Sequence, residues 1–150
     1  MATASKGIEP GREMPPVVKR LNQEKINIFE SVSAVVMEKD IAPRSEVSLH
    51  TDEELAKQAG FTSQVASGMM AVSFLNEALR KFFGADTWNH TGKLAVTFIA
   101  PAYAGDEVSA KGVVKEKAAE GDAVRVSLEV WCEKQDGTKT AVGTASATVR

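Results

Sequence analysis

Two short segments carry groups whose types and positions could do chemistry: His50 and the Ser67-Gly68-Met69 tripeptide. Imidazole titrates near neutrality, so a histidine can take or give a proton at working pH. His50 directly precedes an acidic helix start, where a side chain is held in place but can remain accessible. From position alone, two interpretations stay open for His50: a catalytic acid/base, or an ordinary surface histidine.

The Ser67-Gly68-Met69 tripeptide opens a long apolar helical pattern. A helix N-terminus presents free N–H groups and a partial positive charge, and a glycine there lets a ligand atom approach the backbone closely. These properties outline an oxyanion site at Gly68. The alternative is that Ser67 only caps the helix, as serine often does, and that Gly68 only packs tightly.

The other reactive residue types have a structural explanation. His90 lies in the polar stretch DTWNHTGK, which is typical of a surface loop. Cys132 alternates with valines and is interpreted as a small core residue without thiolate activation, and Met69 and Met70 as packing residues. The acidic residues 52–54 suit a helix start, and no second histidine or cysteine lies at ligand spacing, so no metal site is predicted.

The elements that must position these residues begin with helices in the first half of the chain. A first helix opens at Asn22 or Gln23, with Ile26, Phe29 and either Val32 or Ser33 on one face. The segment 34–47 is predicted to be a loop with fragments of strand or helix, because its Pro43 disfavours helix at the preceding residue.

Two further helices follow. Thr51 and Glu54 match a capping box, which predicts a helix over residues 51 to 59 that stops at Gly60. The wide apolar stripe from residue 68 to residue 83 predicts a largely buried helix, and Gly84 is placed to end it.

The second half of the chain changes to a period of two. Alternating apolar residues predict strands over residues 94–100, 108–114, 124–132 and 139–149, with turns at 120–122 and 135–137. Together with a short strand at 17–21, this predicts an α+β domain in which an antiparallel sheet packs on the buried helix. Residues 1–16, rich in glycine and proline, are expected to form a flexible lead-in.

Composition excludes several classes of partner. The 150 residues suit one domain with a real core, and a net charge of −2 provides no basic field for nucleic acid or an anionic membrane. No segment has the length of a membrane span or the core of a signal peptide, and Cys132 is the single cysteine. A cytoplasmic protein is therefore expected.

Three motifs resemble those of the MaoC-like hydratases and dehydratases, which have the hotdog fold. The motifs are LHTDEELAKQAGF from residue 49 to residue 61, VASGMM from 65 to 70, and FIAPAYAGDEV from 98 to 108. The resemblance covers roughly residues 11 to 149. It implies a single hotdog domain over residues 17–150, with a long central helix wrapped by an antiparallel sheet.

This resemblance implies reversible addition of water to a trans-2-enoyl thioester, usually of coenzyme A. The family's D-x-N-P-[IL]-H-x-D motif supplies an aspartate and a histidine that position and deprotonate water. Matched residue by residue, His50 is that histidine, and Gly68 offers the N–H that polarises the thioester carbonyl. Ser67, Met69 and the polar helix residue Asn76 fall on substrate-binding positions.

The sequence departs from the family's pattern: the motif's asparagine and proline fall on Val47 and Ser48, and two site positions also differ. Ser45 stands where the catalytic aspartate is expected, and Ser67 where the helix-entry histidine is expected. A serine is no general base alone, and losing one member of an acid/base pair commonly costs about 10²–10⁴ in rate. The segment 34–47 is longer than the corresponding segment in the family. Asp40 or Glu46 is therefore a candidate to take the place of the missing catalytic aspartate.

Three functions remain as hypotheses. The first is a hydratase or dehydratase of acyl-CoA or acyl-carrier thioesters, with His50 as acid/base and Gly68 as oxyanion donor. The second is a non-catalytic hotdog subunit that binds acyl-CoA or supports a partner, and the third is a hotdog thioesterase. The resemblance further implies no metal or redox cofactor, coenzyme A as substrate carrier, and a homodimer or a larger homo- or hetero-oligomer.

Overall fold

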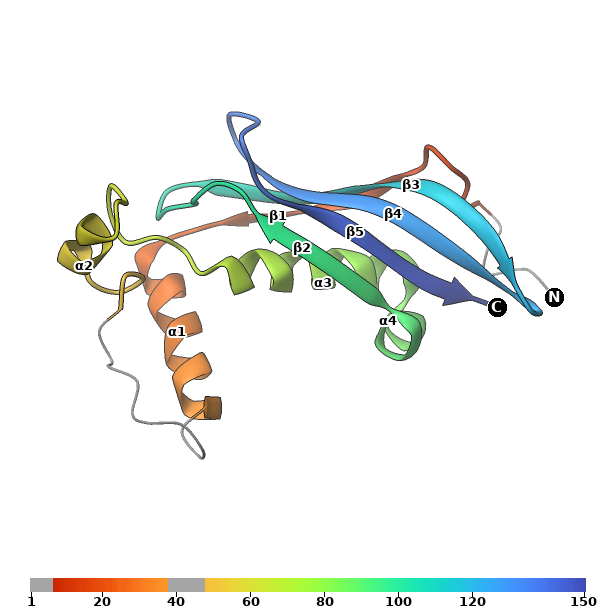
Figure 1. Cartoon of the computed structure of the whole chain (residues 1–150), viewed down its shortest axis with the longest axis horizontal. Coiled ribbons are helices and arrows are strands. Elements are labelled where there is room, and N and C mark those ends of the chain that lie inside the picture. Colours follow the sequence, from red (N-terminus) through yellow and green to blue (C-terminus); the bar gives the residue numbers. More distant parts are fainter. Residues whose placement is uncertain (1–6, 38–47) are drawn as a thin grey trace.

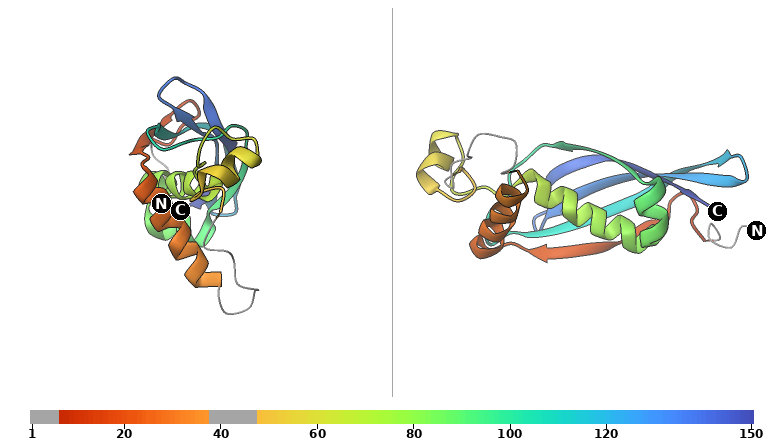
Figure 2. Two further views of the ribbon diagram at one scale, coloured as in Figure 1. Left: turned by 90° about the vertical axis from the view of Figure 1, so that its left-hand side faces the viewer. Right: turned by 90° about the horizontal axis from the view of Figure 1, so that it is seen from below.

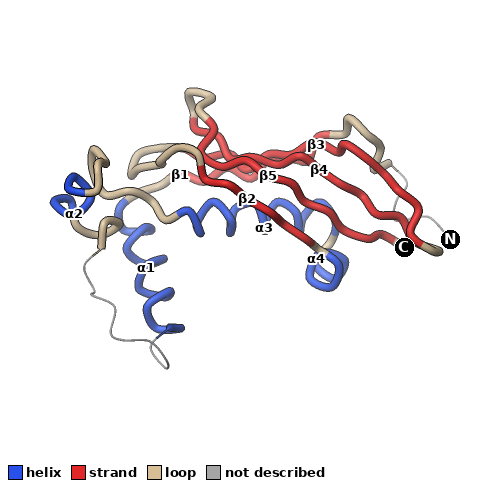
Figure 3. Tube along the Cα trace, in the orientation of Figure 1, coloured by secondary structure: helices blue, strands red, loops and turns tan. Residues whose placement is uncertain are grey.

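The computed structural model describes residues 7–37 and 48–150. In this part of the chain a five-stranded sheet curves around a long helix, α3, which lies against its concave face (Figures 1 and 3). The elements in chain order are β1 Glu13–Arg20, α1 Gln23–Met37, α2 Glu53–Gln58, α3 Gly68–Phe83, α4 Ala85–Thr91, β2 Lys93–Phe98, β3 Glu107–Glu120, β4 Ala123–Lys134 and β5 Lys139–Val149. All strand pairs are antiparallel, in the order β1-β3-β4-β5-β2. The α+β class predicted from the sequence is confirmed.

The N-terminal segment packs further upstream than predicted. β1 begins at Glu13, and Ile8 and Met14 bury their side chains in the core. The ladder between β1 and β3 shifts register between Met14 and Val17, around two prolines that have no N–H to donate. The expected flexible lead-in over residues 1–16 is therefore wrong for residues 7–16, because their apolar side chains gain burial against the sheet and α3.

Helix α1 opens where the sequence predicted. The Asn22 side-chain oxygen accepts a hydrogen bond from the Lys25 N–H at 2.8 Å, which is an N-cap contact. Ile26 is fully buried, whereas Val32, one of the two residues considered for the same face, is 59% exposed. The helix continues into the predicted loop 34–47 as far as Met37. It projects away from the sheet near the N-terminus of α3 (Figures 1 and 2).

The short helix α2 uses a different cap from the predicted one. The side chain of Asp52, not Thr51, accepts a hydrogen bond from the Leu55 N–H at 2.9 Å. The Thr51 hydroxyl oxygen instead accepts from the Ser48 N–H at 3.0 Å. The predicted capping box is therefore wrong by one residue, while the predicted stop at Gly60, which has a φ of +92°, is confirmed.

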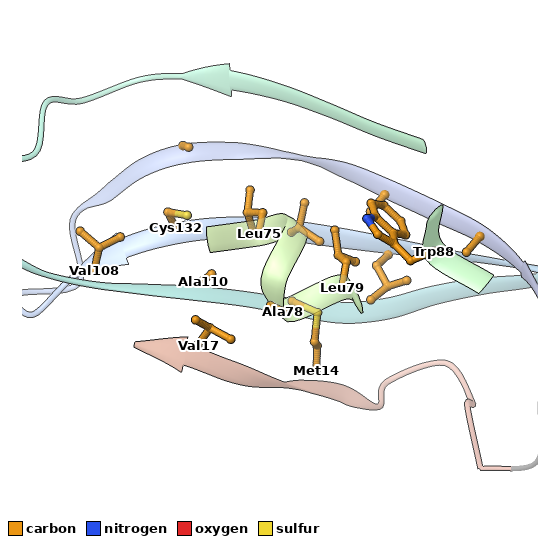
Figure 4. Packing of buried hydrophobic residues seen from close by; sticks show 14 of the residues in the cluster. Met14, Val17, Leu75, Ala78, Leu79, Trp88, Val108, Ala110 and Cys132 are labelled. Atoms are coloured by element: carbon orange, nitrogen blue, oxygen red, sulfur yellow. The ribbon is translucent and has the colours of Figure 1, made fainter. Parts of the chain in front are cut away.

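Helix α3 forms the centre of the core, as its apolar stripe predicted. Its fully covered side chains include Leu75, Ala78 and Leu79, which meet the concave face of the sheet (Figure 4). Ser67 caps the helix by accepting from the Met69 N–H, and Gly84 follows the last turn with a φ of +88°.

The polar stretch around His90 is a helix, not the predicted loop. In α4 the Trp88 side chain is buried and its ring stacks on Phe83, with centroids 6.1 Å apart. Gly92 follows directly, and an added Cβ there would lie 2.6 Å from the Trp88 ring. Burial of one tryptophan thus organises a segment whose other residues are polar, while His90 remains on the exposed side.

The strands β3, β4 and β5 form two consecutive hairpins, as predicted. Gly121 and Gly137 occupy their turns with positive φ. On β4 the predicted apolar face is confirmed: Val126, Leu128 and the two inward residues that follow are buried, while Val124 packs at the edge of the core. β3 extends to Glu120, beyond the predicted end at 114.

No helix among the described residues is long and apolar enough to cross a membrane.

Candidate functional site

A cavity of about 450 Å³ lies at the end of the molecule where α3 begins. Its wall combines the His50 turn, the first turns of α3, the segment after β2 and the start of β5. The lining is mostly apolar, with Met70, Phe74 and Phe98 among its larger side chains, and the polar side chains in it belong to His50, Ser67 and Thr140. Because these residues are far apart in the sequence, the cavity forms only when the chain folds.

The backbone around His50 is held by a tight turn and a neighbouring helix. The Ser48 hydroxyl accepts from the His50 N–H at 3.2 Å, and the Asp52 N–H bonds to the Ser48 carbonyl at 2.8 Å. Gln23, at the start of α1, donates its side-chain N–H to the His50 carbonyl at 2.9 Å. These bonds fix the backbone position from which the His50 side chain extends.

The ring of His50 has a definite partner. Its Nδ1 lies 2.7 Å from the carbonyl oxygen of Val65. A carbonyl oxygen only accepts, so Nδ1 carries the hydrogen and, in the neutral ring, Nε2 keeps its lone pair. In this tautomer Nε2 is the ring nitrogen that is able to accept a proton.

Gly68 lies close to the Phe98 ring at the start of α3. A Cβ added to Gly68 would lie 2.8 Å from the ring of Phe98, which is closer than real Cβ contacts allow. Ser67 accepts from the Met69 N–H at 3.3 Å, and the Ser67 carbonyl accepts from Met70 at 2.9 Å. Within the described part of the chain, the Gly68 N–H has no such acceptor, and Gly68 lines the cavity.

The segment after β2 is hydrogen-bonded to the residues that lead into α3. Val65 forms an isolated antiparallel bridge with Tyr103, and the Ala66 N–H bonds to the Ala102 carbonyl at 2.8 Å. The Asp106 carboxylate accepts from the Tyr103 N–H at 2.9 Å and closes the loop that follows. The FIAPAYAGDEV motif thus holds Val65, the hydrogen-bond partner of His50.

Two of the residues carried over from the resemblance, Met69 and Asn76, do not line the cavity. Met69 is 56% exposed and is not among the lining residues. Asn76 accepts a hydrogen bond from the indole N–H of Trp88 at 2.9 Å, so it anchors α4 rather than the cavity. Ser45, together with the alternative acids Asp40 and Glu46, lies outside the described residues.

Thr140 is a cavity residue that the sequence did not single out. It follows the turn 135–137 and begins β5, where strict alternation would put either Thr140 or Ala141 on the inner face. Both are buried, at 5% and 0% exposure. No local sequence signal marks the burial of both residues, since it depends on how β5 pairs with β4.

Among the described lining residues, the cavity combines the titratable side chain of His50 with the backbone N–H of Gly68 in mostly apolar surroundings. No group of three or more metal-ligating side chains occurs among residues 7–37 and 48–150. Cys132 is fully buried, as predicted, and burial raises the pKa of its thiol to about 12, so it supplies no thiolate. The arrangement suits proton transfer at a bound group whose oxygen meets the start of α3.

Two comparisons with known proteins, one with family models and one with curated sequences, gave different results. A family model described as a MaoC-like domain matches residues 46–134, more than half of the chain. A search of curated protein sequences gave no match.

Solved structures resemble the whole chain. An (R)-hydratase from A. caviae involved in PHA biosynthesis has a TM-score of 0.72 at 22% identity, over 97% of this chain and 99% of its own. A MaoC-like dehydratase from Rhodospirillum rubrum has a TM-score of 0.75 at 19% identity, over 99% and 96%. The HadBC complex of Mycobacterium tuberculosis, a 3R-hydroxyacyl-ACP dehydratase, has a TM-score of 0.62 at 18% identity, over 93% and 96%. These likenesses confirm the hotdog fold predicted from the sequence.

Proposed function

Because the chain belongs to the MaoC-like domain family, we propose that it adds water to 2-enoyl thioesters and removes it from 3-hydroxyacyl thioesters. The acyl group is carried by coenzyme A or an acyl carrier, and no further cofactor takes part. His50 is the acid/base and the Gly68 N–H binds the thioester oxygen. The observation that carries the proposal is the pairing of His50 with Val65 in a cavity that also contains Gly68.

In hydration, the Nε2 atom of His50 takes a proton from water as the water oxygen bonds to C3 of the enoyl group. Electrons move from the double bond onto the thioester oxygen, which accepts a hydrogen bond from the Gly68 N–H. The developing negative charge also meets the positive end of α3. Return of a proton from His50 to C2 restores the thioester and the neutral ring, and dehydration follows the reverse course.

The apolar wall supports an acyl chain as the bound group. Met70, Phe74 and Phe98 provide the larger apolar surfaces of the cavity. Apolar surroundings also strengthen hydrogen bonds to the developing oxyanion, because little water competes for them. Ser67 completes the polar part of the wall beside Gly68.

A histidine pair in the chain allows a matched test. Replacing His50 with Ala should lower kcat/KM for hydration by about 10²–10⁴. Hydration is measured as the loss of the conjugated enoyl-thioester absorbance across a panel of CoA substrates. The control is His90→Ala, since His90 lies on α4 and is exposed. Turnover by His50→Ala equal to that of His90→Ala would contradict the role of His50.

One observation favours a second candidate function. Ser45 stands at the position where the family has the aspartate that it pairs with its histidine. A subunit that binds acyl-CoA, or supports a catalytic partner, needs no such acid. Product analysis separates the candidates: hydration leaves the thioester intact, hydrolysis by a thioesterase releases a free thiol, and a binding subunit does neither.

The two edges of the sheet differ, which supports assembly through β2. The β1 edge contains two adjacent prolines and a register shift, features that block pairing with another strand. β2 has no proline and, among the described strands, pairs only with β5. Phe98 and Ile99, at and after its end, are 51% and 54% exposed. A homodimer joined edge to edge at β2 would bring this apolar surface and the cavity mouth near the partner.

A further inference from the structure

The start of β5 contains a β-bulge at Thr140. Along the β4–β5 ladder Cys132 pairs with Ala141, and the next pair is Glu133 with Lys139, so Thr140 has no partner of its own. A bulge of this kind re-aims side chains and is common beside active sites. Here its effect is that two consecutive residues, Thr140 and Ala141, are both buried.

The bulge places a hydroxyl-bearing residue in the mostly apolar wall of the cavity. Thr140 is 5% exposed, is the single polar residue in the buried class among those described, and lines the cavity. Its neighbours in the wall include Ile99, Ala100 and Val108. Putting a hydroxyl in apolar surroundings has a cost unless the hydroxyl is well hydrogen-bonded.

The internal hydrogen bond of this hydroxyl is long. The Thr140 Oγ1 atom lies 3.4 Å from the Cys132 carbonyl oxygen, at the outer limit for an O–H···O contact. The backbone carbonyl of Thr140 already accepts from the N–H groups of Ile99 at 2.9 Å and Ala100 at 3.3 Å. Those backbone bonds hold the cavity wall whichever side chain is present, so the wall itself does not require a hydroxyl.

We infer that Thr140 is a specificity-determining residue that hydrogen-bonds an oxygen substituent on the acyl chain. This rests on the proposed function, because it takes the cavity as the acyl site. The hydroxyl can donate to a keto or hydroxyl oxygen and accept from a hydroxyl group. The substrate class is therefore an acyl thioester oxygenated along its chain, in addition to the oxygen handled by His50.

The test measures binding without turnover. Octanoyl-CoA is saturated between C2 and C3 and cannot be hydrated, so its dissociation constant reports binding without turnover. It is compared by calorimetry with derivatives hydroxylated at each of the last three chain carbons. We expect wild-type protein to bind at least one derivative about fivefold to tenfold more tightly than octanoyl-CoA, the usual effect of one neutral hydrogen bond.

Two variants identify Thr140 as the source of the preference. Thr140→Val keeps the shape and should remove the preference, while Thr140→Ser should retain it. Equal wild-type affinity for all four thioesters, or a preference that survives in Thr140→Val, would overturn the inference and leave the hydratase proposal standing. If wild-type protein binds none of the thioesters, the proposed function fails and this inference fails with it. Equal wild-type affinities overturn the inference even if a variant does not fold, and Thr140→Ser and Thr140→Val each test the assignment separately.

Discussion

The imidazole Nδ1 of His50 donates a hydrogen bond to the carbonyl oxygen of Val65, 2.7 Å away and fifteen residues later in the chain. The bond joins the turn before α2 to the segment that enters α3. It selects one tautomer of the ring, and His50 lines the same cavity as Gly68.

This relationship predicts the behaviour of two His50 variants. His50→Asn places an amide N–H near the position of Nδ1 and should keep the bond to Val65, whereas His50→Ala loses it. We expect both variants to lose enoyl-thioester hydration, and His50→Ala to melt at the lower temperature. Hydration by His50→Asn at the wild-type rate would show that the ring acts only by holding Val65. In wild-type protein, nitrogen NMR of the neutral ring should show the proton on Nδ1.

The contact between Gly68 and Phe98 predicts a coupled pair of substitutions. Gly68→Ala should lower both stability and kcat, because its Cβ would meet the Phe98 ring at 2.8 Å and displace the start of α3. An overpacked site of this kind typically costs about 1–3 kcal/mol. Adding Phe98→Ala should recover part of the loss in a thermal or urea unfolding cycle. Purely additive effects of the two substitutions would contradict the contact.

Asn76 is predicted to matter for stability and not for catalysis. Asn76→Leu removes the acceptor of the buried Trp88 N–H, which should cost about 1–3 kcal/mol in urea unfolding. The kcat/KM of the folded variant should stay near the wild-type value, because Asn76 does not line the cavity. Asn76→Asp keeps an acceptor and serves as the matched variant. A large fall in kcat/KM with unchanged stability would instead return Asn76 to the substrate site.

Cys132 predicts a pH dependence of labelling and stability. Burial raises the pKa of its thiol to about 12, above the unfolded value near 8.5. The folded state therefore holds the proton more tightly, and this contribution to stability is full below about pH 8.5 and is lost as pH rises from there toward 12. At pH 8 a disulfide reagent should label the thiol only as fast as the protein opens, and Cys132→Ala should abolish the labelling. Rapid stoichiometric labelling of folded protein would contradict this burial.

The candidate site could be predicted only in part. His50, Ser67 and Gly68 line the cavity, at positions that the resemblance to the family assigned to the site, whereas their types and spacing alone left an ordinary structural role open. Met69 and Asn76 were placed by matching positions, and matching does not say which face of α3 turns toward the cavity. Met69 points outward and Asn76 serves Trp88.

The sequence by itself determined the helix α3 and the strands β3 to β5, since periodicity, caps and turn glycines are local properties of the chain. Tertiary structure decided what those local rules leave open. Burial of Trp88 turned a polar stretch into α4, and packing of Met14 drew the first strand upstream. The bond from His50 to Val65 depends on how distant segments meet, and the bulge that buries Thr140 depends on how β5 pairs with β4. A contact between segments fifteen or more residues apart has no local signature, so the fold alone could assemble the cavity.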